Sequence, residues 1–355
     1  MKIVINSRFL TQQLTGVQRF ALEISRQLKK SGRDMKFIAP PKIFHKSGAE
    51  ELDAVSYGKF TGHFWEQLDL PRYLRKARHP LLVNLANTAP LFYKNQIITI
   101  HDLAFLRNPS WFSKTFYCFY RFLLPAIAEN SLKIITVSEF SKKEIMRLLN
   151  IPGEKIKVVR NAVSESFPDS AEHASRYCDE EYLLAVSSMD PRKNIKNLLA
   201  SFNRLNLKDM KLIVAGPENK IFASGKSGKP TTAEHNVAFT GYTSDKELAV
   251  LYRNAKMFVY PSLYEGFGLP PLEAMACGCP VVVSNVASLP EVCGDAAYYV
   301  DPYDVESIAD GMYRVLTDDD LRQNLIKKGF ERVKLFSWEK SAKEHIRVFD
   351  EVLNK

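Results

Sequence analysis

Short apolar runs alternate with helix-like segments along the whole chain, and this alternation constrains the fold more than any other feature. In the first half, the apolar runs lie at residues 2–6, 36–39, 81–85, 96–100 and 133–137. In the second half, they lie at residues 182–186, 211–215, 237–240, 257–260 and 281–283. Helix-like segments lie at residues 16–29, 194–205, 245–254, 271–277 and 304–316. Apolar strands separated by amphipathic helices predict parallel sheets that are covered on both faces.

Two such halves in tandem predict an α/β protein with two Rossmann-like domains, whose parallel sheets face each other across a cleft. The length of 355 residues supports two domains, each with its own core. We expect an N-terminal domain at residues 1–164 and a C-terminal domain at residues 165–335, with the boundary in a polar segment. Residues 216–234 are polar, contain three glycines and are expected to form a long loop. Residues 336–355 are expected to form a final helix that either crosses back to the N-terminal domain or caps its own.

The most specific motif places two carboxylates, Glu265 and Glu273, around a glycine turn. Pro270 and Pro271 suit the first turn of a helix, and we expect Glu273 in that turn. The glycine turn would then present backbone N–H groups at a helix N-terminus, which favours anion binding. A ligand with a diphosphate and several hydroxyl groups, such as a nucleotide sugar, fits this arrangement. The turn consists of Gly266, Phe267, Gly268 and Leu269.

This motif resembles the C-terminal signature of the retaining glycosyltransferases of family 4, which have the GT-B fold. The resemblance extends over both glutamates, the glycine turn and the run from Glu273 to Val281. It implies that Glu265 contacts hydroxyl groups of the transferred sugar and that Glu273 accepts hydrogen bonds from the ribose. It also implies that the backbone of the glycine turn binds sugar and phosphate, and that neither a metal ion nor a cofactor is needed. By the same resemblance, residues 1–164 form the acceptor-binding domain and residues 165–335 the nucleotide-sugar-binding domain.

The segment that begins at Ser187 follows a strand and opens a helix, as does the diphosphate-binding turn of the family. Lys193 matches the family's lysine, which offsets the charge on the leaving diphosphate. Ser187 replaces the usual glycine, and Ser188 stands where many members have an arginine. The neighbouring Arg192 is therefore the candidate for a second cation. Farther along, Tyr242 lies in a turn that resembles the segment whose backbone reads the nucleobase.

Two turns in the first half also resemble family motifs. His101 and Asp102 follow an apolar run, and the carboxyl ends of strands are where open α/β sheets bind ligands. The resemblance implies that His101 contacts the donor sugar or its phosphate, whereas Asp102 either meets substrate or caps the next turn. Gly16 lies in the turn after the first strand, where close approach of the donor phosphate favours a residue without a side chain.

The two halves differ in charge. Residues 1–164 carry 26 Lys and Arg against 12 Asp and Glu, while residues 165–355 carry 23 against 28. The basic half either attracts an anionic membrane, the phosphates of a lipid-linked acceptor or nucleic acid, or is an evenly solvated surface. No nucleic-acid-binding module is recognisable, so we expect no such partner. The aromatic segment 111–125 forms either a core helix or an amphipathic helix at a membrane surface.

Other local patterns limit the chemistry and the compartment. Five cysteines, at positions 118, 178, 277, 279 and 293, form no zinc-ligand pattern and predict reduced thiols in the cytoplasm. We find no apolar run long enough for a transmembrane helix and no signal-peptide core. Asp318 and Asp320 have the spacing of a metal motif, but their position before Leu321 predicts a helix N-cap. Ser141 and Glu144 have capping-box spacing, which predicts a helix start at Ser141.

The resemblance to family 4 implies a metal-independent retaining hexosyltransferase that moves mannose, rhamnose or glucose from a nucleotide sugar to an acceptor hydroxyl. The expected acceptor is a lipid-linked glycan in surface-polysaccharide assembly (O-antigen or capsule), at the inner face of the cytoplasmic membrane. His101 and Glu265 are expected at the reaction centre. Two alternatives remain open. One is another GT-B enzyme, either a sugar-nucleotide epimerase or a phosphorylase, and the other is a non-catalytic membrane-associated subunit that binds nucleotide sugars.

Overall fold

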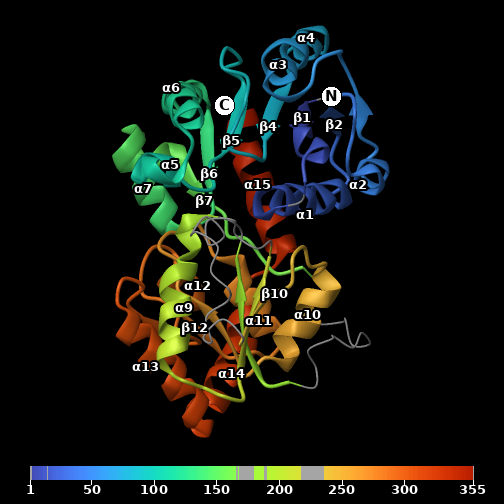
Figure 1. Cartoon of the computed structure of the whole chain (residues 1–355). Helices are drawn as coiled ribbons and strands as arrows, with labels where there is room; N and C mark the ends of the chain where they lie inside the picture. Colours follow the sequence, from blue (N-terminus) through green and yellow to red (C-terminus); the bar gives the residue numbers. More distant parts are fainter. Residues whose placement is uncertain are drawn as a thin grey trace. The chain divides into compact units, whose positions relative to one another are not determined.

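The computed structural model describes residues 2–13, 15–164, 167, 180–187, 190–216 and 236–354. The chain forms two compact units (Figure 1): unit 1 comprises Met1–Asn161 and Ser337–Lys355, and unit 2 comprises Ala162–Phe336. Most of the expected boundary segment, and the expected loop beyond Gly216, lie outside the described residues. No helix in the described part of the chain is long and apolar enough to cross a membrane.

Unit 1 contains one sheet of seven parallel strands in the order β3-β2-β1-β4-β5-β6-β7. The strands are β1 (Ile3–Asn6), β2 (Met35–Ala39), β3 (Val55–Ser56), β4 (Leu81–Asn84), β5 (Gln96–Thr99), β6 (Lys133–Thr136) and β7 (Ile156–Val158). The chain adds β2 and β3 on one side of β1 and then places β4 on the other side. β1 and β4 therefore flank the switch point of the sheet, where open α/β sheets bind ligands at the carboxyl ends of strands.

Helices cover this sheet. Helix α1 (Gly16–Lys30) buries Phe20, Ile24 and Leu28 along one face, as their spacing predicts. Helix α15 (Trp338–Leu353) belongs to unit 1 and packs on α1, with the Trp338 ring 6.0 Å from that of Phe20. The other helices are α2 (Lys46–Glu51), α3 (Gly62–Phe64), α4 (Leu70–Lys76), α5 (Ala104–Arg107), α6 (Lys114–Asn130) and α7 (Glu139–Leu149).

One expectation for this unit needs correction. Helix α7 begins at Glu139 rather than at Ser141, because the side chain of Ser138 caps it by accepting a hydrogen bond from the Ser141 N–H at 3.0 Å.

The aromatic segment lies partly on the core and partly at the surface. In α6, the fully buried residues lie in the C-terminal half, and Tyr117 and Tyr120 of the first half are partly buried and pack against the core of unit 1. Phe116, Phe119 and Phe122 are exposed. The first half of α6 therefore has tyrosines at the edge of the core and phenylalanines at the surface.

Unit 2 contains a sheet of six parallel strands in the order β10-β9-β8-β11-β12-β13. The strands are β8 (Tyr182–Val186), β9 (Lys211–Ala215), β10 (Val237–Phe239), β11 (Met257–Tyr260), β12 (Val281–Ser284) and β13 (Tyr298–Val300). Here β9 and β10 lie on one side of β8 and β11 lies on the other. The switch point of this sheet is therefore between β8 and β11.

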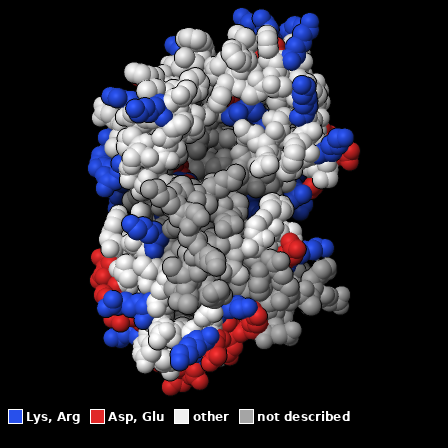
Figure 2. Space-filling model, in the orientation of Figure 1, with Lys and Arg blue, Asp and Glu red and all other residues white. Residues whose placement is uncertain are grey.

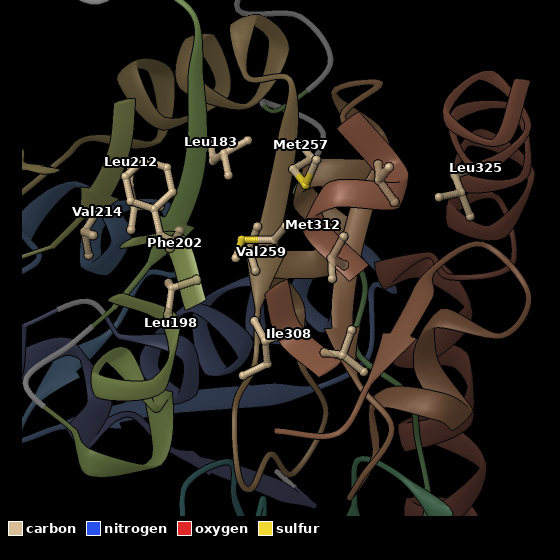
Figure 3. Packing of buried hydrophobic residues seen from close by; sticks show 14 residues of the cluster. Leu183, Leu198, Phe202, Leu212, Val214, Met257, Val259, Ile308, Met312 and Leu325 are labelled. Carbon is tan, nitrogen blue, oxygen red and sulfur yellow. The ribbon is translucent and has the colours of Figure 1, made fainter. Parts of the chain in front are cut away.

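The core of unit 2 lies between this sheet and its helices (Figure 3). Leu183 of β8 and Val259 of β11 pack with Phe202 of α9 and with Ile308 and Met312 of α13 in one buried cluster. In the described part of unit 2, the helices with given bounds are α9 (Ile195–Arg204), α10 (Asp245–Asn254), α11 (Leu269–Ala276), α12 (Leu289–Cys293), α13 (Val305–Thr317) and α14 (Asp319–Val333). Both parallel sheets, and hence the expected α/β class, are confirmed.

Surface charge follows the difference between the two halves of the sequence. On the face shown in Figure 2, Lys and Arg predominate over unit 1, whereas most of the Asp and Glu side chains in view lie on unit 2. Several basic side chains of unit 1 also pair locally with acids, as Lys29 Nζ does with Asp53 Oδ2 at 2.6 Å. On this face, the excess positive charge of the N-terminal half is exposed on unit 1.

Candidate active site

Two residues that the sequence singled out meet at the switch point of unit 2. Lys193 follows β8 and Glu265 follows β11, and the Lys193 ammonium lies 2.7 Å from Oε1 of Glu265. Lys193 also donates to the Tyr260 hydroxyl, with its Nζ 4.8 Å from the centre of that ring. The adjacent strands β8 and β11 thus bring together two side chains that are distant in the sequence.

The Glu265 carboxylate is held in its ionised form. Its Oε1 also accepts hydrogen bonds from the Tyr260 hydroxyl at 2.9 Å and from Ser262 Oγ at 2.6 Å. Burial by itself raises the pKa of Glu265, but the charges of Lys193 and Arg192 and the hydrogen bonds outweigh it, so the pKa lies below its ordinary value. Burial and the neighbouring Glu265 raise the pKa of Tyr260 well above its usual range, so the phenol keeps its proton and donates.

The turn that carries Lys193 is fixed by local hydrogen bonds. It is a short 3-10 turn, η5 (Pro191–Lys193), capped by Asp190, whose Oδ1 accepts from the Arg192 N–H at 3.0 Å. Arg192 Nε donates to Asp190 Oδ2 at 2.6 Å. The Leu263 N–H donates to the Arg192 carbonyl at 2.7 Å, which ties the turn to the segment that holds Glu265. Ser188, which stands where many family members have an arginine, lies outside the described residues.

The glycine turn opens helix α11 at an unexpected residue. Gly268 is the N-cap with φ of 98°, and α11 begins at Leu269, two residues before the expected start. The positive φ favours glycine, and a Cβ on Gly268 would lie 2.6 Å from Leu289 Cδ2, so the Leu289 side chain would also have to shift. Because Pro270 and Pro271 lack an N–H, Leu269 alone among the first three helical residues can offer one to an anion. Gly266 and Phe267 precede this cap.

Glu273 lies one turn later than expected. Since α11 starts at Leu269, Glu273 belongs to its second turn, and placing it in the first turn was wrong. Glu273 is buried, and the Tyr252 hydroxyl donates to its Oε2 at 3.4 Å. Burial and the Glu273 charge raise the pKa of Tyr252 well above its ordinary value, so this phenol also remains a donor.

A second pair of glycines joins the ends of β8, β9 and β10. Gly216 and Gly241 form an isolated antiparallel bridge. Gly216 has φ of 137°, and a Cβ there would lie 1.7 Å from the Ser187 carbonyl oxygen, so no other residue fits. Tyr242, the candidate beside the nucleobase, is 89% exposed.

The candidates of unit 1 have different surroundings. His101 follows β5, is buried, and its Nε2–H donates to the Leu85 carbonyl at 3.1 Å, while its ring meets Phe20 edge to face. Burial lowers the pKa of His101, so the ring is neutral at pH 7. Asp102 Oδ1 accepts from the Ala104 N–H at 3.0 Å, as a turn cap does. Gly16 is the first residue of α1, and a Cβ there would meet nothing within 4 Å.

The sequence missed Tyr260 and Ser262, which complete the hydrogen bonding of Glu265. Tyr260 is the last residue of β11, and a polar residue at the carboxyl end of a buried strand was the available signal. Asp318 Oδ1 accepts from the Leu321 N–H at 2.8 Å, so the expected N-cap is confirmed. Among the described residues, no group of three or more His, Cys, Asp or Glu side chains is placed to hold a metal ion.

Two parallel-sheet units in one chain, with a cation–carboxylate pair and a glycine turn at the switch point of the second, are typical of a GT-B glycosyltransferase. Family comparisons agree: residues 14–167 match Glycosyltransferase Family 4, and residues 167–332 match Glycosyl transferases group 1. O-antigen chain mannosyltransferase B of Escherichia coli is 32% identical, with 98% of this chain and 99% of the relative covered. The chain belongs to glycosyltransferase family 4.

Solved structures share this fold. Sucrose-phosphate synthase of Thermosynechococcus elongatus superposes with a TM-score of 0.77 at 20% identity and covers 100% of this chain and 99% of its own. HepE of Anabaena, solved in complex with UDP and glucose, has a TM-score of 0.73 at 14% identity and covers 99% of this chain and 100% of its own. At such identities the likeness establishes the fold, and the two-unit GT-B architecture is confirmed.

Proposed function

We propose that the protein transfers a hexose from a nucleotide sugar to an acceptor hydroxyl and retains the anomeric configuration. The observation that carries this proposal is the pair of Lys193 and Glu265 at the switch point of unit 2. A buried carboxylate held in its ionised form accepts hydrogen bonds from sugar hydroxyl groups. The ammonium beside it stabilises the negative charge that develops on a leaving diphosphate.

The donor is proposed to occupy the carboxyl ends of the strands in unit 2. Lys193 binds the diphosphate, and Arg192 adds positive charge while it is held by Asp190. Glu273 accepts hydrogen bonds from the ribose, and His101 of unit 1 contacts the sugar. The full set of proposed donor-binding residues is Gly16, Ser188, Arg192, Lys193, Tyr242, Gly266, Phe267, Gly268, Leu269 and Glu273.

Glu265 is proposed to bind the sugar rather than to attack it. Its Oε1 is shared by Lys193, Tyr260 and Ser262, and such hydrogen bonds stabilise the carboxylate and weaken it as a nucleophile. The proposed route to retention is therefore a front-face transfer, in which the departing diphosphate takes the proton of the acceptor hydroxyl. No metal ion takes part in this scheme.

Mannose is the first sugar to test, with rhamnose and glucose as the other candidates. The support is the similarity to a mannosyltransferase of O-antigen chains along nearly the whole chain. By the same argument, the proposed acceptor is a lipid-linked glycan in surface-polysaccharide assembly. The alternatives of an epimerase, a phosphorylase or a non-catalytic binding subunit are distinguished by whether a product forms from donor and acceptor together.

We also propose that unit 1 rests on the inner face of the cytoplasmic membrane. Phe116, Phe119 and Phe122 are exposed on α6, and Phe122 is 74% exposed. The basic side chains Lys114 and Arg121 lie on the same helix. A helix with apolar and basic residues on its exposed surface suits an interface with anionic lipids.

A thermal-shift screen of nucleotide sugars tests the donor site first. GDP, UDP, ADP and dTDP, each alone and with mannose, glucose or rhamnose attached, would be added to the purified protein. A ligand that binds the folded protein raises its melting temperature by mass action. A shift with one base identifies the donor class and leads to turnover assays, whereas no shift with any nucleotide removes the basis of the proposal.

Substitutions then test the two charged residues. Glu265→Gln and Lys193→Ala are each expected to lower turnover roughly tenfold or more, about 1.4 kcal/mol of barrier or greater. The matched control is Lys196→Ala, which removes an exposed lysine three residues away on α9. Normal turnover by folded Lys193→Ala protein would contradict the site assignment.

A further inference from the structure

Unit 1 holds a second buried cation–carboxylate pair, also at the switch point of its sheet. Asn6 ends β1 and Asn84 ends β4, and the Asn6 side-chain amide donates to Asn84 Oδ1 at 2.9 Å across that point. Arg8 follows β1, and its Nε donates to Oε1 of Glu66 at 3.2 Å. The arrangement parallels that of Lys193 and Glu265 in unit 2. Carboxyl ends of strands at a switch point are where open α/β sheets bind ligands.

The buried Glu66 carboxylate holds the side chains of this cluster in place. It is 1% exposed and lies on a π-helical turn, η2 (Trp65–Asp69), a conformation that is frequent at functional sites. Its Oε1 also accepts from Asn6 Nδ2 at 2.8 Å and from Thr88 Oγ1 at 3.2 Å. Burial by itself raises the pKa of Glu66, but the Arg8 charge and the hydrogen bonds outweigh it, so the pKa lies below its ordinary value.

Arg8 presents one donor outward while two of its nitrogens are fixed. Nε is bonded to Glu66, and Nη2 donates to Thr88 Oγ1 at 2.5 Å. Nη1 donates to no atom in the part of the chain that the structure describes, and about a tenth of the side chain, 10%, is exposed. A planar guanidinium held at two positions offers its remaining N–H groups in a fixed direction at low entropic cost.

Aromatic rings connect to this cluster through His63. His63 Nδ1 lies 3.6 Å from Glu66 Oε2, and His63 Nε2 lies 3.2 Å from the Tyr120 hydroxyl. The Tyr120 ring stacks on Phe116 at 4.2 Å and contacts Phe119. A few fixed polar groups beside aromatic surfaces are typical of small-molecule sites. The side chains of Asn6, Asn84 and Thr88 place further amide and hydroxyl groups in the same cluster, and such a set of donors and acceptors suits a polyhydroxylated ring.

We propose that Arg8, positioned by Glu66 and Thr88, binds a hydroxyl group of the acceptor sugar in unit 1, beside Tyr120. The inference rests on the proposed function, because it assigns the acceptor of that same transfer. Arg8 is the group in contact with the sugar, and Glu66 is a positioning residue that acts through Arg8. Unit 1 thereby selects the acceptor by its hydroxyl groups rather than by charge.

The test separates acceptor binding from donor binding. Octyl glycosides of mannose, rhamnose, glucose and N-acetylglucosamine serve as acceptor probes, with the nucleotide sugar that gives the largest thermal shift as donor. Arg8→Gln is expected to raise KM for the accepted glycoside about tenfold or more, since a hydrogen bond to a charged group is lost. The donor Kd is expected to stay within about twofold. Arg26→Gln, which removes another paired arginine of unit 1, is the matched control.

A double variant tests the proposal even if the Arg8→Gln protein does not fold. Arg8→Gln leaves Glu66 buried without its counter-charge, which destabilises proteins, whereas an apolar pair in place of a buried ion pair is tolerated. Arg8→Met with Glu66→Leu is therefore expected to fold and bind donor, yet to lose use of the glycoside. Folded protein with an unchanged acceptor KM would overturn the proposal. So would a wild type that binds donor but neither uses nor is stabilised by any glycoside, or an Arg8-dependent thermal shift with inorganic phosphate. A wild type that binds no nucleotide would instead refute the proposed function.

Discussion

Gly268 and Gly16 open helices in much the same way in the sequence, but their surroundings give them different physical roles. Gly268 has a positive φ and faces Leu289, so the fold itself favours glycine there. Gly16 has free space around the position of a Cβ, so nothing in the described fold requires glycine. Gly16 is the residue proposed to let the donor phosphate approach the backbone closely, and that proposal can be tested without disturbing the fold.

Alanine substitutions are expected to separate these two roles. Gly268→Ala should destabilise the protein by about 1–3 kcal/mol, because it combines a left-handed backbone with a short contact to Leu289. Gly16→Ala should leave the melting temperature unchanged and weaken nucleotide-sugar binding. Thermal melts with and without the donor measure both effects. A Gly16→Ala protein that binds donor normally would remove Gly16 from the site.

At this scale the sequence predicts individual residues better than their contacts. Lys193 and Glu265 were identifiable because each follows a buried strand and matches a motif. The Tyr260 and Ser262 hydrogen bonds to Glu265 were not predictable, because they depend on where β11 ends relative to the turn that follows. Arg192 was identifiable as a cation candidate. Its pairing with Asp190 was not predictable, because it depends on the conformation of the turn Pro191–Lys193, which Asp190 caps.

Among the elements, helix α15 contributes a buried histidine to unit 1. His345 is fully buried, its Nδ1 lies 2.8 Å from the Ser341 carbonyl, and its ring lies 5.8 Å from Phe20. Burial lowers the pKa of His345 from 6.5 to about 4. The packing of α15 on α1 therefore requires a neutral imidazole.

A lower pH is therefore expected to reduce the free energy of unfolding of unit 1. The folded-state pKa of His345 lies below its ordinary value, so between pH 6.5 and about 4 the unfolded chain binds a proton that the folded chain does not. Stability falls as the pH drops through this window, by about 2 kcal/mol at pH 5. Hydrogen exchange of α1 and α15 amides at pH 7 and pH 5 measures it. His345→Gln should lose most of this dependence, whereas His79→Gln, at an exposed position, should keep it. Equal protection at both pH values in the wild type would contradict the argument.

Element boundaries were predictable where apolar runs are long, and less so elsewhere. The long runs gave β1, β4, β8 and β11 within a residue or two, because burial on both faces demands continuous apolar sequence. Strand β3 has only two residues, which is too short for an apolar run that would predict a strand. The start of α11 was misplaced because the double proline suggested a first turn, whereas the left-handed Gly268 begins the helix earlier.

For the whole molecule, the difference in charge between the halves of the chain gives a surface prediction. Vesicles rich in phosphatidylglycerol should sediment with the protein at low salt, and binding should weaken as salt screens the basic unit 1. Phe119→Ser with Phe122→Ser should reduce binding about tenfold or more, since an inserted Phe side chain contributes about 1.5–3 kcal/mol. Tyr313→Ser, at an exposed residue of unit 2, is the control. Equal binding to neutral phosphatidylcholine vesicles would contradict the prediction that the positive charge of unit 1 attracts anionic lipids.

The return of α15 to unit 1 sets an order of folding during synthesis. Ribosomes deliver the chain from its N-terminus, so residues 337–355 emerge after all of unit 2. Until then the face of α1 around Phe20 has no Trp338 to pack against, and the Arg160 carbonyl lacks the Ser341 hydroxyl that donates to it. Synthesis of unit 1 therefore begins before that of unit 2 and ends after it. A nascent chain that ends at Phe336 would already contain strands β8 to β13 of the unit 2 sheet, while unit 1 still lacks its last helix.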